Sequence, residues 1–192
     1  MSGIYIHIPF CKQACHYCDF HFSTNLKKKD EMVLALAKEI EMRKSEFQDE
    51  IVETIYFGGG TPSILQIADL KFLIDAVYKN YKVVENPEIT VEANPDDLTE
   101  NRIIELSNNK VNRLSIGIQS FFEDDLQLMN RAHNVEEAKK CLEIATHYFD
   151  NISIDLIYGV PEMSNEKWLQ NIETALSFGV PHISSYALTV EP

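Results

Sequence analysis

The chain has 192 residues, of which 45% are hydrophobic and 24% are charged. This balance is typical of a folded globular protein with one substantial core, so a mainly disordered chain is excluded. Seventeen Lys and Arg residues against thirty Asp and Glu give a formal net charge of −13, which repels nucleic-acid phosphates and anionic lipid. Nucleic acid and a membrane surface are therefore poor candidates for a partner.

The N-terminal segment predicts neither a signal peptide nor a membrane span, because its apolar run is short, contains His7 and follows no basic leader. We therefore expect a cytoplasmic protein. Three of the four cysteines, Cys11, Cys15 and Cys18, are close together, unlike the dispersed cysteines of a secreted disulfide-bonded protein. In a reducing compartment, such a cluster indicates a metal site.

The first half of the chain predicts three short strands, at 3–8, 53–57 and 88–92, which are rich in β-branched and aromatic residues. An apolar stripe from Val33 to Phe47 predicts a helix after the first strand. A clearer stripe, whose apolar residues recur at helical spacing over 70–81, predicts a helix after the second strand.

The second half predicts strands at 113–118, 152–156 and 182–188, again with helical stretches between them. Cys141 shares one apolar helical face with Ala138 and Leu142, so we predict a core residue and not a ligand. The last helix has the clearest ends, because Ser164 can cap its first turn and Gly179 can end it. In total, the sequence predicts five helical stretches between six strands.

Regular alternation of strands and helices predicts an α/β protein whose strands are parallel and joined by right-handed crossovers. Periodicity alone leaves both a doubly wound sheet and a (βα) barrel open. No repeat or linker divides the chain, so residues 1–192 are expected to form one domain. The sequence stops just after the sixth strand, and we therefore expect a fragment that lacks its last helix.

The cysteine cluster directly follows the first predicted strand. Thiolates are the natural ligands of iron–sulfur clusters and of zinc. A cubane cluster held by three thiolates keeps one iron open to a small ligand, whereas zinc would take a fourth protein ligand. His7, His16 and His21 are close enough in sequence to supply it, so both metals remain open at this point.

Polar or glycine-rich residues also follow the other predicted strands. In parallel α/β folds these carboxyl ends meet at one edge, where active sites usually form. Taken alone, each residue has a structural explanation, such as a tight turn at Gly58–Gly60 or a surface charge at Arg131. Together with a metal loop they favour a ligand site. The residues concerned are Gly58, Gly59, Gly60, Thr61, Glu92, Gln119, Asp155 and Ala187.

The Cys-x3-Cys-x2-Cys spacing, together with the Gly-Gly-Gly-Thr-Pro run at 58–62, resembles the radical S-adenosylmethionine (SAM) superfamily. Further segments are similar to the branch that contains oxygen-independent coproporphyrinogen III oxidases and HemW-type haem chaperones. These segments cover residues 5–11, 57–62, 92–95, 115–121 and 155–161.

This resemblance implies a partial (βα)6 barrel and a [4Fe–4S] cluster held by Cys11, Cys15 and Cys18. It also implies that SAM binds the open iron and that the cluster and SAM, rather than protein side chains, carry out the electron transfer and bond cleavage. The residues that match contacts to this cluster-bound SAM are Tyr5, Gly59 and Glu92. The residues that match contacts to a second SAM are Tyr17, Gly60, Thr61, Gln119, Arg131, Asp155 and Ala187.

Two departures separate the sequence from the oxidase pattern. The oxidases carry a fourth cysteine two residues after the third, whereas Phe20 occupies that position here. They also carry a longer N-terminal extension before the first cysteine. Both departures match the chaperone branch, which implies haem as a further ligand, with a haem-acceptor protein and an electron donor as partners. Oxidation of coproporphyrinogen is the alternative, and the family's haem-binding segment would lie beyond Pro192.

Overall fold

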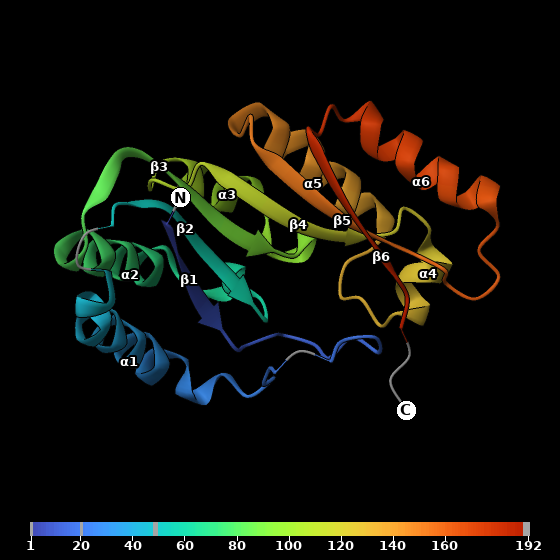
Figure 1. Ribbon diagram of the computed structural model, residues 1–192. Helices are drawn as coiled ribbons and strands as arrows, with labels where there is room; N and C mark the ends of the chain where they lie inside the picture. The colour runs from blue at the N-terminus through green and yellow to red at the C-terminus, as the bar shows by residue number, and fades with distance from the viewer. Residues whose placement is uncertain (1, 20, 48–49, 190–192) are drawn as a thin grey trace.

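The computed structural model describes residues 2–19, 21–47 and 50–189, which form one curved sheet with helices packed along it (Figure 1). All neighbouring strands are parallel and are ordered as in the sequence, from β1 to β6. The strands are β1 (Ser2–Ile8), β2 (Val52–Gly59), β3 (Val83–Ala93), β4 (Arg113–Gln119), β5 (Ile152–Tyr158) and β6 (His182–Ala187).

This strand order distinguishes between the two predicted architectures. A doubly wound sheet reverses its strand order at one point, whereas here every crossover leads to the next strand in the same direction. Because right-handed crossovers that advance in one direction place their helices on one face, the sheet curls into an open barrel. The predicted parallel α/β fold with a partial barrel is therefore confirmed.

The connections contain α1 (Lys29–Met42), α2 (Ile67–Asn80), α3 (Glu100–Ser107), α4 (Glu123–Leu128), α5 (Val135–Tyr148) and α6 (Asn165–Ser177). Short 3-10 helices are η1 (Leu26–Lys28), η2 (Arg43–Phe47), η3 (Pro62–Ile64) and η4 (Pro95–Asp97). The sequence predicted one helical stretch for each connection, but the fourth connection contains two. Residues 129–134 separate them: Asn130, with φ 56°, cannot continue α4, and Asn134 caps the start of α5.

Several helix ends match the sequence prediction. The Ser164 hydroxyl accepts a hydrogen bond from the Lys167 amide at the start of α6, and Gly179 follows the helix with φ 71°. Strand β3 differs from its prediction, since it begins at Val83 and not at residue 88. It does so through an irregular register beside β2, which accommodates Pro87 within the strand.

The hydrophobic core lies between the sheet and its helices. In β4, Leu114, Ile116 and Ile118 are buried in this core, whereas the alternate residues Ser115, Gly117 and Gln119 line a cavity on the other face. Cys141 is 3% exposed and belongs to the core, as its helical face predicted. Two-residue alternation along the strands thus builds both the core and the cavity wall.

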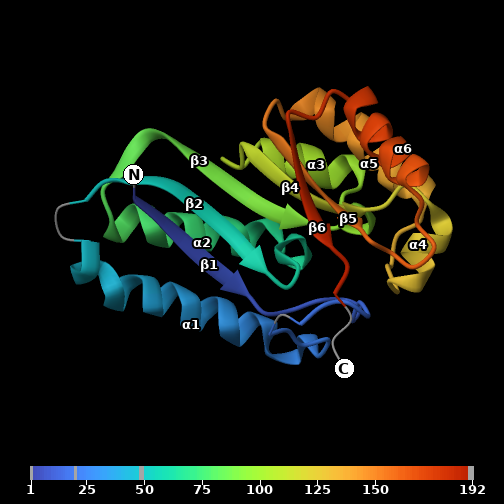
Figure 2. The same ribbon diagram turned by 45° about the vertical axis from the view of Figure 1, so that its right-hand side comes forward.

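None of the helices in the described ranges is both long and apolar enough to cross a lipid bilayer. The segment after β1 runs along the edge at which the strand arrows end, as Figures 1 and 2 both show. Figure 2 also shows the end of β6 approaching the same edge. The carboxyl ends of the strands and the cysteine segment therefore share one side of the molecule.

Candidate functional site

A cavity of about 660 Å³ opens at the carboxyl ends of the strands. All of the predicted site residues except Gly58 line it, although they come from all six strands and from the loops between them. These residues are Tyr5, Cys11, Cys15, Tyr17, Cys18, Gly59, Gly60, Thr61, Glu92, Gln119, Arg131, Asp155 and Ala187. The fold thus gathers into one place the groups that the sequence scatters over more than 180 positions.

The cysteine loop is held by backbone hydrogen bonds from neighbouring segments. The amide of Thr61 donates to the carbonyl of Phe10 at 2.7 Å, and the amide of His16 donates to the carbonyl of Met129 at 3.1 Å. All four cysteines carry thiols and not disulfides. Burial raises the pKa of the Cys11 thiol, although a hydrogen bond with Thr61 opposes this effect.

The glycine run after β2 permits a close approach to the cysteine loop. A Cβ at Gly60 would lie 2.6 Å from the Phe10 carbonyl oxygen and 3.0 Å from the Cys11 sulfur. Gly59 has φ 112°, and a Cβ there would lie 2.6 Å from the His7 ring. The run is therefore more than a tight turn, because side chains at these positions would push the two loops apart.

Of the three carboxylate residues that line the cavity, Asp19, Glu92 and Asp155, the last two lie on strands β3 and β5. Glu92 accepts hydrogen bonds from the Tyr56 hydroxyl at 2.7 Å and from the Gly59 amide at 3.0 Å. Burial raises the pKa of Glu92, and these hydrogen bonds oppose it. Burial and the charge of Glu92 together raise the pKa of Asp155 to about 6. Keeping both Glu92 and Asp155 ionised in the cavity wall is therefore energetically unfavourable.

Arg131 is not the surface charge that its sequence context alone predicted. Its guanidinium donates to the Asn94 side-chain oxygen at 2.6 Å and to the Gly117 carbonyl at 2.9 Å. It also lies 3.4 Å from the Cys15 sulfur and 3.2 Å from the Tyr17 hydroxyl. The buried Nε atom has no hydrogen-bond partner among the described residues. The loop after α4 carries this cation into the cavity, which sequence periodicity does not reveal.

Three further residues shape the site: Tyr56 and Asn94 were not among the predicted site residues, and His7 was considered only as a zinc ligand. Tyr56 orients Glu92, and Asn94 links Arg131 to the Thr61 hydroxyl, to which it donates at 3.3 Å. His7 lines the cavity and pairs with the Tyr5 hydroxyl at 3.2 Å. For Asn94 and His7, the position beside strand ends was an available signal, whereas the role of Tyr56 depends on cross-strand pairing.

The donor set fits an iron–sulfur cluster better than zinc. Three thiols face one cavity, and the Arg131 cation beside Cys15 offsets the negative charge that thiolate ligands bring. Within the described ranges, no three or more His, Cys, Asp and Glu side chains lie close enough together to hold a single metal ion. The His16 Nδ1 atom faces the Leu128 carbonyl at 3.0 Å, and His7 faces Tyr5. Two of the three histidines considered as a fourth zinc ligand, His7 and His16, thus have other polar partners.

Comparisons with known proteins agree with this geometry. A profile of the radical SAM superfamily matches residues 5–175. The chain is 38% identical to the haem chaperone HemW of Escherichia coli over 99% of its length, and 39% identical to that of Bacillus subtilis over 100%. It covers 51% and 52% of these relatives, so it spans about half of their length.

Solved structures show the same fold. Coproporphyrinogen III oxidase (HemN) from Escherichia coli superposes with a TM-score of 0.89 at 28% identity, covering 99% of this chain and 44% of that one. The archaeal Elp3 of Methanocaldococcus infernus superposes with a TM-score of 0.65 at 18% identity, covering 83% of this chain and 43% of that one.

Membership in this superfamily implies a [4Fe–4S] cluster and SAM, and the cavity offers thiols and polar groups suited to both. The profile match spans most of the sequence, and the similarity to HemW extends along all of it. The chain therefore belongs to the radical SAM superfamily and is homologous along its whole length to the HemW haem chaperones.

Proposed function

We propose that Cys11, Cys15 and Cys18 hold a [4Fe–4S] cluster whose remaining iron stays open to SAM. The observation that carries this proposal is the placement of three thiols on the wall of one cavity at the carboxyl ends of the strands. When bound, the cluster supplies an electron to the sulfonium of SAM. The chain's own contribution is to position the thiols and to balance their charge through Arg131.

The proposed SAM contacts fall into two groups within the same cavity. Tyr5, Gly59 and Glu92 would bind the SAM on the cluster, with the Glu92 carboxylate accepting hydrogen bonds from the ligand. A second SAM or another polar ligand would contact the remaining set. This set consists of Tyr17, Gly60, Thr61, Gln119, Arg131, Asp155 and Ala187. The cavity volume, about 660 Å³, lies in the range that is usual for sites of this kind of ligand.

For the whole protein, we propose a cytoplasmic haem chaperone of the HemW type, of which residues 1–192 form the radical SAM domain. The similarity to HemW proteins over the full chain supports this proposal. Haem would be a further ligand, bound with the help of a C-terminal domain that follows in such proteins. A haem-acceptor protein and an electron donor would be its partners.

A second candidate is an oxygen-independent coproporphyrinogen III oxidase, because the HemN structure superposes with a TM-score of 0.89. Sequence identity to HemN is 28%, against 38% to HemW of the same organism, which favours the chaperone. Phe20, which replaces the fourth cysteine of the oxidases, points the same way, although it lies outside the described residues.

The two candidates are separated by reconstituting the full-length protein with cluster, SAM and reductant under anaerobic conditions. A haem chaperone is expected to bind haem and transfer it to an acceptor without decarboxylating coproporphyrinogen III. Conversion of coproporphyrinogen to protoporphyrinogen would contradict the chaperone assignment. Failure to bind haem together with absence of turnover would contradict both.

The cluster itself is tested by iron and sulfide analysis of anaerobically prepared protein. We expect Cys18→Ala to lose stable cluster loading while its circular dichroism spectrum stays unchanged, because the core is built elsewhere. Cys141→Ala is the matched control, since it removes a thiol that lies in the core and should retain the cluster. Stoichiometric zinc in colourless wild-type protein would contradict the proposal.

A further inference from the structure

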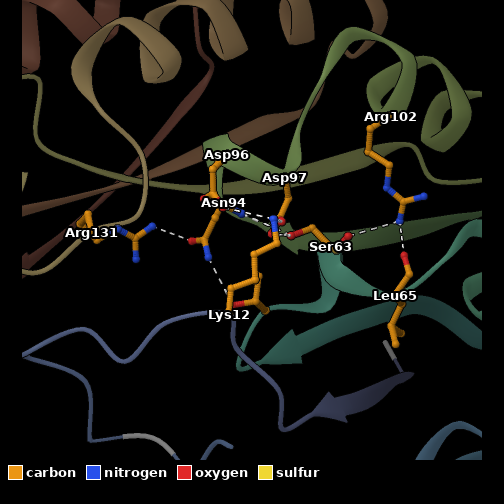
Figure 3. A network of polar contacts seen from close by, with 9 residues as sticks. Lys12, Ser63, Leu65, Asn94, Asp96, Asp97, Arg102 and Arg131 are labelled. Carbon is orange, nitrogen blue, oxygen red and sulfur yellow. Dashed lines mark hydrogen bonds and ion pairs between the residues drawn. The ribbon is translucent and has the colours of Figure 1, made fainter. Parts of the chain in front are cut away.

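A polar network fastens the cysteine loop to the turn that follows β3 (Figure 3). Lys12 lies between the first two cysteines of the loop, and its ammonium group forms ion pairs with both aspartates of η4. The distance to Asp96 is 3.3 Å, and the ammonium also contacts the Asp97 carboxylate. The contact joins residues that are 84 positions apart in sequence.

Asp97 is a fixed anchor. Its side chain is 4% exposed and accepts a hydrogen bond from the Ser63 hydroxyl at 2.7 Å. Arg102 of α3 in turn donates to the Ser63 carbonyl at 3.4 Å and to the Leu65 carbonyl (Figure 3). The anchor is therefore tied to the segments after β2 and β3 and to the first turn of α3.

The opposite end of the same turn also reaches the cysteine loop. Asn94 accepts from Arg131 at 2.6 Å, and Arg131 in turn lies 3.4 Å from the Cys15 sulfur. Other contacts also hold the loop, among them a hydrogen bond from the Cys11 amide to the Ser23 carbonyl at 3.1 Å and one from the Asn130 side chain to the Ala14 carbonyl at 2.8 Å. Residues 94–97 therefore contact the cysteine loop directly through Lys12 and indirectly through Arg131.

We propose that Lys12 is a positioning residue, which holds the segment between Cys11 and Cys15 against the 94–97 turn so that the thiols face the cavity before a cluster binds. A lysine ammonium is charged at neutral pH, and Lys12 faces two carboxylates in this turn, so the contact is an ion pair. The effect of Lys12 on a cluster rests on the proposed function, whereas its effect on the position of the cysteine loop does not.

The test is hydrogen exchange, followed by mass spectrometry, on cluster-free full chains of the wild type, Lys12→Met and Lys12→Arg. Lys12 is 48% exposed, and screened ion pairs of this kind contribute modestly, so exchange of peptides across residues 10–19 should accelerate about two- to fivefold in Lys12→Met. Lys12→Arg should restore wild-type exchange, because a guanidinium can also pair with Asp97. Lys71→Met, at an exposed position of α2, is the matched control.

Asp97→Asn keeps a partner for Ser63 but loses the ion pair, and it should accelerate exchange of the same peptides. Combining it with Lys12→Met should accelerate exchange little more than Lys12→Met alone, because that change already removes the contacts with both Asp96 and Asp97. Peptides from the buried strand β4 report global unfolding and should not change. Wild-type exchange in Lys12→Met, or failure of Lys12→Arg to restore it, would overturn the proposal.

Iron release provides the link to the cluster. Anaerobically reconstituted Lys12→Met should lose iron to a chelator about two- to fivefold faster than the wild type, in proportion to loop opening. If the wild type takes up no iron, the proposed cluster fails while the exchange result still decides the role of Lys12. Equal iron release in a variant whose loop exchanges faster would overturn the role of the fastening in cluster retention.

Discussion

The buried charge of Asp155 in the cavity wall should lower the free energy of unfolding at neutral pH. Burial, together with the charge of Glu92, raises its pKa to about 6 from the ordinary value of 3.8. The folded chain therefore holds this proton up to a higher pH than the unfolded chain does. As a result, its contribution to stability falls as pH rises between about 4 and 6. The gap between the two pKa values corresponds to roughly 3 kcal/mol, at about 1.4 kcal/mol per pH unit.

We expect Asp155→Asn to be more stable than the wild type by about 1 to 3 kcal/mol at pH 7.5, because the amide carries no charge to bury. The hydrogen bond with Ser184 can be kept by an asparagine. The repulsion between Asp155 and Glu92 is already included in this range, because it contributes to the raised pKa of Asp155. At pH 4 the difference should nearly vanish, because Asp155 is then protonated in the folded wild type.

The assay is urea unfolding of both ligand-free proteins at several pH values from 4 to 7.5. His133 also contributes to the pH dependence, because burial lowers its pKa to about 4, but both proteins share this contribution and it cancels in their difference. Asp150→Asn removes the same charge from an exposed position and should change stability by less than about 0.5 kcal/mol. An Asp155→Asn variant that is no more stable at pH 7.5, or equally stabilised at pH 4, would refute the reasoning.

Two further changes test the cavity wall. Gly60→Ala should destabilise the fold by about 1 to 3 kcal/mol in urea unfolding. The new methyl group would lie 2.6 Å from the Phe10 carbonyl oxygen and 3.0 Å from the Cys11 sulfur. Unchanged stability would mean that the two loops can separate freely. Tyr56→Phe removes the 2.7 Å hydrogen bond to Glu92 and should weaken SAM binding about tenfold, measured by titration calorimetry. Loss of that bond also raises the pKa of Glu92, so the pH at which SAM affinity falls should move upward, and an unmoved pH profile would contradict the role of Tyr56.

Local features of the sequence were sufficient for much of the fold. The stripe that predicted α2 buries Leu70, Leu73 and Ile74, and the caps that predicted α6 form as expected. These features depend on residues a few positions apart, whose interactions are nearly independent of the rest of the chain. The break between α4 and α5, over residues 129–134, was missed, although Asn134 and Glu137 form a capping box at the start of α5.

The sequence by itself determined the alternation of strands and helices, the three cysteines on one loop and the set of strand-end residues that resembles a radical SAM site. Only the tertiary structure decided the strand order, the burial of Arg131 and the contact of Lys12 with Asp97. The physical reason is the range of the interactions. Spacing and capping act within a few residues, whereas these contacts join distant segments and exist only once the sheet has placed its strand ends side by side.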